Sequence, residues 1–121
     1  MNCPRSKFGC ISVEKDIFIF GGKKGKERAS DAQVWSEKTW KNGSNLRKKR
    51  SGFGIVSIDH LIYIIGGNDG DSILSSVECL NTQTGEWRKK EPLLEARDEL
   101  AVCLGKDNLI YAIGGFGGKN N

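Results

Sequence analysis

The sequence predicts an all-β protein built from repeated units of short antiparallel strands. Its 121 residues are 37% hydrophobic, which is enough for a packed core. Glycine occurs 16 times against 2 prolines, as expected where tight backbone positions recur. A double glycine also recurs at intervals of 45 and 48 residues, as Gly21-Gly22, Gly66-Gly67 and Gly114-Gly115. The chain is therefore organised as a repeat.

Each unit is predicted to begin with a β-hairpin. The apolar runs before the double glycines carry aromatic residues and are typical of strands buried on both faces: 16–20, 61–65 and 109–113. A further strand precedes each run across a short turn, at 8–13, 54–58 and 100–104. The sequence therefore predicts three hairpins that end in a double glycine.

A third and a fourth strand are predicted downstream of the first two double glycines. After a polar loop, short strands are expected at 32–35 and 76–80, and each is followed by a turn and a tryptophan, Trp40 or Trp87. The turn before Trp40 is shorter by about two residues than the turn before Trp87, so the last strands are less well defined in the first unit. A complete unit has four short strands.

Such units are expected to stack as the blades of a propeller, because a single sheet cannot bury both of its faces. The double glycines allow positive φ and close backbone approach, and the two tryptophans are predicted to fill gaps between blades at equivalent places. The predicted blades cover 1–49, 50–96 and, for the first two strands only, 97–121.

An arginine stands ahead of each hairpin, at Arg5, Arg50 and Arg97. With the double glycine and the later tryptophan, this pattern resembles the kelch repeat over nearly the whole chain. The unit at 50–96 is the most similar, with Ser76-Val77-Glu78-Cys79-Leu80-Asn81 followed by Thr84-Gly85-Glu86-Trp87. The resemblance implies a kelch-type β-propeller fragment of about two and a half four-stranded antiparallel blades.

The repeats look like those of kelch-like adaptors, which implies non-catalytic recognition of proteins. In that family a BTB dimerisation domain and a helical BACK domain, both outside this sequence, engage a cullin scaffold. The propeller then presents a protein substrate for ubiquitylation. The alternative is a cytoskeletal kelch protein that binds actin, since the basic half of this chain suits an acidic filament.

The resemblance also implies where a partner binds: just before each first strand and just after each double glycine. The corresponding residues are Arg5, Ser6, Arg50, Ser51, Arg97 and Asp98 before the strands, and Lys23, Asn68, Asp69 and Phe116 after the glycines. An arginine at a channel mouth suits a partner that carries carboxylates, because guanidinium offers paired donors. The alternative is that each arginine pairs with an acidic residue of a neighbouring blade.

Charge is divided unevenly along the chain. Residues 1–50 carry 13 Lys/Arg against 5 Asp/Glu, and residues 51–121 carry 6 against 10. The basic runs at 23–26 and 47–50 lack interleaved aromatic residues. They therefore indicate a solvated face rather than a nucleic-acid site.

No catalytic group, cofactor or metal site is predicted. The only histidine, His60, falls in a hairpin turn, and the glycine-rich stretches at 66–70 and 114–118 do not open a helix, as a phosphate loop must. The 4 cysteines are too far apart for a zinc pattern or a disulfide framework and are expected to be buried thiols. Without a signal peptide or an apolar run of membrane-spanning length, we expect a cytoplasmic protein.

Overall fold

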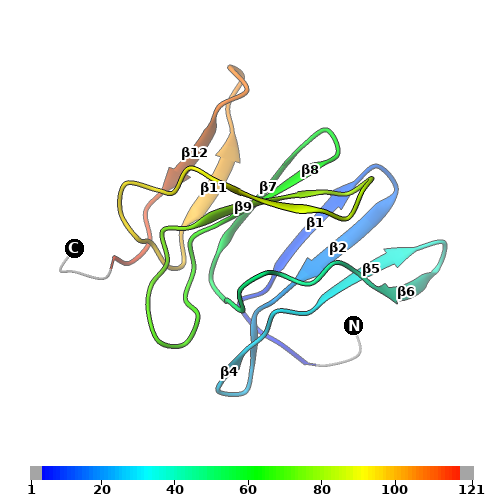
Figure 1. The fold of residues 1–121 in the computed structure, drawn as a ribbon, viewed down its shortest axis with the longest axis horizontal. Coiled ribbons are helices and arrows are strands. Elements are labelled where there is room, and N and C mark those ends of the chain that lie inside the picture. The colour runs from blue at the N-terminus through cyan, green and yellow to red at the C-terminus, as the bar shows by residue number, and fades with distance from the viewer. Residues whose placement is uncertain (1–3, 118–121) are drawn as a thin grey trace.

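The computed structural model describes residues 4–117. Within that range every regular element is a β-strand. The strands form two four-stranded antiparallel sheets and a two-stranded hairpin, which follow one another through the molecule, and a small additional hairpin (Figure 1). The strands are β1 (Gly9–Val13), β2 (Asp16–Phe20), β3 (Lys23–Lys24), β4 (Glu27–Arg28), β5 (Ala32–Ser36), β6 (Thr39–Asn42), β7 (Gly54–Ile58), β8 (Leu61–Ile65), β9 (Val77–Asn81), β10 (Trp87–Lys90), β11 (Ala101–Leu104) and β12 (Ile110–Ile113).

The predicted all-β fold with four-stranded antiparallel blades is confirmed. The first sheet has the strand order β1-β2-β5-β6 and the second β7-β8-β9-β10, so each is a simple meander. Strands β11 and β12 form the third hairpin, and β3 and β4 form the additional one in the loop after the first double glycine. Each main sheet or hairpin lies inside one of the three repeat ranges inferred from the sequence.

The short turn in the first sheet still supports a complete blade. Glu37 and Lys38 have φ of 51° and 66°, and the flanking Ser36 and Thr39 are paired. This is a two-residue turn whose twist matches that of the flanking strands, so β5 and β6 pair without the longer loop of the second sheet. The missing residues shorten the turn and leave the strands intact.

The two tryptophans stand at equivalent places, as predicted. Trp40 pairs with Trp35, and Trp87 pairs with Leu80. Trp35 and Leu80 in turn each pair with the second residue of the second strand of their sheet. The register therefore matches in the two sheets although the tryptophans are 47 residues apart in a repeat of 45.

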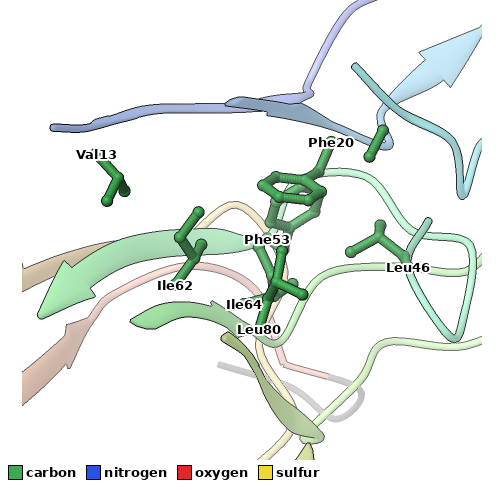
Figure 2. Close-up of a cluster of buried hydrophobic side chains, with 8 residues drawn as sticks. Val13, Phe20, Leu46, Phe53, Ile62, Ile64 and Leu80 are labelled. Carbon is green, nitrogen blue, oxygen red and sulfur yellow. The ribbon is translucent and has the colours of Figure 1, made fainter. Parts of the chain in front are cut away.

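The core lies between the first two sheets (Figure 2). Figure 2 shows Phe20 from β2 beside Phe53, which precedes β7, with Ile64 of β8 beneath them and Ile62 of the same strand to their left. A smaller cluster joins the second sheet to the third hairpin through Val56, Ile65, Val77 and Leu100. Apolar side chains buried between neighbouring sheets therefore hold the units together.

Glycine is required where the first strands of neighbouring units meet. Strands β1, β7 and β11 lie next to one another. A Cβ on Gly9 would lie 2.3 Å from the ring of Phe53, and one on Gly54 would lie 2.0 Å from Val102. These distances are far below van der Waals contact, so a side chain at either position would push adjacent sheets apart.

All six glycines of the three pairs have positive φ, between 58° and 101°. A Cβ on Gly66 would lie 2.6 Å from the carbonyl oxygen of Arg97 in the next unit. The double glycine therefore combines the unusual backbone conformation with the close approach that the sequence indicated.

Apolar side chains are exposed on the outer faces of the end units. Ile17 of the first sheet is 38% exposed, and Leu109, Tyr111 and Ile113 of the third hairpin are 44–59% exposed. These faces have no neighbouring sheet among the described residues. Exposed apolar side chains on a sheet face without a neighbouring sheet favour association.

The same faces correct the prediction for the cysteines. Cys79 is buried as expected, but Cys10 and Cys103 are exposed. Both lie on strands of the end units, on the faces that point away from the second sheet. Cys3 lies outside the described residues.

Among residues 4–117, none of the elements is a helix long and apolar enough to cross a membrane.

Candidate protein-binding rim

The predicted partner-binding positions are brought together at one end of the sheets. In each unit the residue after the arginine forms a β-bridge with a residue after the double glycine, through two backbone hydrogen bonds of 2.7–3.0 Å. The bridged pairs are Ser6 with Lys23, Ser51 with Asn68, and Asp98 with Phe116. We call this end the rim; it comprises residues 5–7, 50–52 and 97–99 and the post-glycine segments 23–28, 68–73 and 116.

Backbone hydrogen bonds also join the rim from unit to unit. The Gly52 N–H donates to the Lys7 carbonyl at 2.9 Å, and the Glu99 N–H donates to the Gly52 carbonyl at 2.8 Å. All three residues stand two positions after an arginine and have φ of 53–64°. The ammonium group of Lys7 forms an ion pair with the carboxylate of Glu99, so this pair spans Gly52.

Sequence reasoning missed Lys7, Gly52 and Glu99. The available signal was their constant spacing from the arginines, with a glycine at the middle position. The left-handed backbone of a lysine and a glutamate is uncommon, and no residue pattern announced it here. The left-handed backbone at these residues accompanies the hydrogen bonds between units, and those bonds form only in the folded chain.

Arg50 makes contacts within its own blade, and the partner contact inferred for it stays a prediction. Its side chain is fully buried, and Nη1 donates to the Gly66 carbonyl at 2.9 Å while Nη2 donates to the Ser76 hydroxyl at 3.0 Å. The Glu78 carboxylate lies 3.8 Å away. Burial lowers the pKa of Arg50, while the charges of Glu78 and Asp69 act in the opposite direction. The guanidinium therefore braces the second blade from inside.

The other two arginines repeat this brace. Nη1 of Arg5 donates to the Gly21 carbonyl, and Nη1 of Arg97 donates to the Gly114 carbonyl, both at 2.9 Å. Arg5 also donates to both carboxylate oxygens of Asp31, at 3.2 and 2.8 Å. The recurring arginine thus connects the start of each unit to the first glycine of its pair, and carboxylate pairing within the blade is the arrangement found for Arg5.

Opposing effects act on Asp31. Burial raises its pKa, but the hydrogen bonds and charges of Arg5 and Lys24 outweigh burial and hold the pKa below its usual value. Asp31 therefore remains ionised at neutral pH and keeps the brace of the first blade charged.

Two more of the predicted contacts, Ser51 and Asp69, are also turned inward. The Ser51 hydroxyl is buried and accepts a hydrogen bond from Arg28 Nε at 2.9 Å. One Asp69 oxygen accepts from the amides of Asp71 and Ser72 at 2.8 Å, and the other lies 3.2 Å from Lys48 Nζ. These amides, assisted by Lys48, lower the pKa of Asp69 to about 2.

The predicted residues that present side chains at the rim surface are therefore fewer than the sequence indicated. Phe116 is 61% exposed, and Ser6 is also exposed. Lys23, Asn68, Arg97 and Asp98 are partly exposed. That any of them contacts a partner stays a prediction.

The basic run at 47–50 is not simply the solvated face that we expected. Lys48 pairs with Asp69 at 3.2 Å, and Arg47 Nε lies 4.0 Å from the carboxylate of Glu78. Basic residues that follow the first sheet thus contact acidic residues of the second. Part of the charge of the basic half is therefore balanced by contacts with acidic residues of the other half.

No group of three or more His, Cys, Asp or Glu side chains able to hold a metal ion occurs in the described part of the chain. His60 lies in the turn between β7 and β8, where its carbonyl accepts from the Thr82 hydroxyl at 2.9 Å.

Residues 49–94 match the family model of the Kelch motif. Among proteins with curated descriptions, none matches the chain. The matched segment holds the entire second sheet, with Arg50 and its double glycine, and the two four-stranded sheets are consistent with kelch blades. A kelch motif is thus present, and kelch repeats generally form protein-binding modules that are usually non-catalytic.

Proposed function

We propose that this chain is a non-catalytic recognition module whose rim binds a segment of another protein. The observation that carries the proposal is the bridge that recurs in all three units, between the residue after the arginine and a residue after the double glycine. It holds loop residues that differ from unit to unit, Lys23, Asn68 and Phe116, on a scaffold of strands, which is the usual arrangement of a binding surface.

The chemistry of the rim suits a peptide-like partner. The side chains of Ser6, Lys23, Asn68 and Asp98 supply donors, acceptors and both charges, while Phe116 supplies an exposed apolar ring. Exposed aromatic residues among polar groups are common centres of protein interfaces. The inward arginines support this surface by fixing the backbone beneath it.

We propose further that the chain is the substrate-binding part of a cytoplasmic adaptor for a cullin-dependent ubiquitin ligase. This finer assignment rests on the resemblance of the unit at 50–96 to kelch-like adaptors. Actin binding is the competing outcome. It depended on the basic half of the chain, and the ion pairs of Arg5, Lys24 and Lys48 within the fold leave less of that charge for a filament.

Site-specific photo-crosslinking tests the rim. A photoreactive amino acid replaces Lys23 or Phe116 at the rim. The controls are Lys15, in the turn between β1 and β2, and Glu86, in the loop between β9 and β10, which are both exposed. The proposal expects a discrete crosslinked protein from the rim positions that the control positions do not give. Equal crosslinking from both sets would rule out the rim as the binding surface.

A second measurement addresses the adaptor role. The crosslinked protein should become more ubiquitylated when the full-length natural protein is present, and inhibition of cullin activation should abolish the increase. Co-sedimentation with actin filaments that weakens as salt rises would instead support the cytoskeletal alternative.

A further inference from the structure

The charges of the rim are segregated by unit. The first post-glycine segment, 23–28, forms the hairpin β3–β4 and carries four basic residues and one acidic residue. The second segment, 68–73, carries Asp69 and Asp71 and no basic residue, and the third unit adds Asp98 and Glu99 beside Arg97. Figure 1 shows the hairpin β3–β4 and the loop after β8 projecting from the same end of the molecule. The rim is therefore basic at the first unit and acidic at the second and third.

Direct contacts connect the basic and acidic parts into one surface. The Lys7–Glu99 ion pair crosses Gly52, and Arg28 reaches from the hairpin β3–β4 to Ser51. On the acidic side Asn68 Nδ2 lies 3.5 Å from Asp98 Oδ2. A partner that lies along the rim therefore meets the two kinds of charge in succession.

Part of this charge is not neutralised within the fold. Among residues 4–117, Lys23, Lys26 and Asp71 form no ion pair. Lys26 and Asp71 are exposed at the tips of their loops. The Oδ2 atom of Asp98 has one long side-chain contact, with Asn68, and its Oδ1 is buried without a hydrogen-bond donor in the described part of the chain. Lys23 and Lys26 lie in the first unit, and Asp71 and Asp98 lie in the second and third. Arg97 of the third unit forms no ion pair within the described range either, and its guanidinium donates to the Gly114 carbonyl.

We infer that the partner segment has segregated charge, with an acidic stretch that lies on the hairpin β3–β4 and a basic stretch that lies on Asp71 and Asp98. This inference rests on the proposed function and specifies the partner. A uniformly acidic segment would place its carboxylates against Asp71 and Asp98, and a uniformly basic one would face Lys23 and Lys26. Like charges in contact are costly, so both are disfavoured.

Three peptides of equal length test the inference by their affinity for the 121-residue chain. One has an acidic block followed by a basic block, the second has the same composition in alternating order, and the third is wholly acidic. We expect the block peptide to bind about tenfold more tightly than the alternating one. The advantage should shrink between about 50 mM and about 300 mM salt, because exposed charges are screened.

Two charge reversals locate the contacts. Lys26→Glu and Asp71→Lys change exposed residues that form no ion pair, so the fold should be retained, and each should weaken the block peptide by about three- to tenfold. Lys15→Glu and Glu86→Lys make the same changes in outer turns and should leave the affinity unchanged. Circular dichroism and melting of each variant check that the fold persists.

The outcomes separate this inference from the proposed function. Equal affinity for the block and alternating peptides, or indifference to both rim reversals, overturns segregated recognition. Tightest binding of the wholly acidic peptide, weakened by Lys26→Glu alone, also overturns it while leaving the rim as a binding surface. If no peptide binds, the inference fails, whereas the proposed function is judged by the crosslinking pattern, which does not depend on charge order.

Discussion

Phe20 of β2 and Trp87 of β10 meet edge to face between the first two sheets, with ring centroids 5.8 Å apart and ring planes at 76°. The contact joins strands from different units. Aromatic pairs in this geometry contribute about 0.5–1.5 kcal/mol beyond the area that they bury. The pair therefore couples the stability of one sheet to the position of the next.

The first prediction concerns this pair. Trp87→Ala should lower the free energy of unfolding by about 3 kcal/mol, since it removes a large ring from the junction between sheets. The double variant with Phe20→Ala should cost less than the sum of the single variants by about 1 kcal/mol. Denaturant unfolding measures both. Trp40→Ala is the control: Trp40 packs against Trp35 in its own sheet, and its loss should cost less.

The second prediction separates bracing from binding at Arg50. Arg50→Ala should destabilise the chain by about 3–5 kcal/mol, because the buried carboxylate of Glu78 would keep only Arg47, 4.0 Å away, as a cationic neighbour. Arg97→Ala removes the equivalent bond in an exposed setting and should cost under about 1 kcal/mol. Thermal melting distinguishes them. An Arg50→Ala chain that melts normally but loses partner affinity would restore the contact role that the sequence suggested.

The third prediction tests the close approach of neighbouring units. Gly54→Ala places a methyl group against Val102 and should cost about 1–3 kcal/mol by overpacking. Adding Val102→Ala frees that space and should recover part of the loss. Chemical unfolding of the two variants gives the comparison. If Gly54→Ala were harmless by itself, the separation of β7 and β11 would have to be larger than described.

The fourth prediction is a pH dependence from Asp69. Its pKa is about 2 in the folded chain, below the usual 3.8, so its ionised form stabilises the fold above about pH 4. That contribution, about 1–2 kcal/mol after allowance for screening by water and salt, should be lost as the pH falls from about 4 to about 2. Asp69→Asn retains an acceptor oxygen but not the charge. The difference in stability between the two proteins should vanish at low pH; a constant difference would contradict the assignment.

The fifth prediction is that the 121-residue chain self-associates through its exposed end faces. Tyr111→Lys and Ile113→Lys place charges on the outer face of the third hairpin, where both side chains are exposed. Either change should shift the chain toward monomer in sedimentation velocity, because it interrupts an apolar surface. Leu94→Lys, at a fully exposed site, is the control. A wild-type chain that sediments as a monomer at all concentrations would refute the prediction.

The sequence by itself determined the repeat, the strands and the positions of the double glycines. Local information suffices for these features: the run Leu61–Ile65 is apolar throughout, turn residues flank it, and Gly66-Gly67 ends it. The same periodicity placed Trp40 and Trp87 at equivalent sites. The match of residues 49–94 to the Kelch motif agrees with the unit that looked most regular.

Only the tertiary structure decided what the repeated polar residues do. An arginine before a strand has the same local pattern whether it points to a ligand or into the blade, and the carbonyl of Gly66 and the hydroxyl of Ser76 draw Arg50 inward. The Lys7–Glu99 pair joins residues 92 positions apart in the sequence. Such contacts depend on the spacing between sheets and on left-handed backbone at the rim, and both arise when the sheets pack.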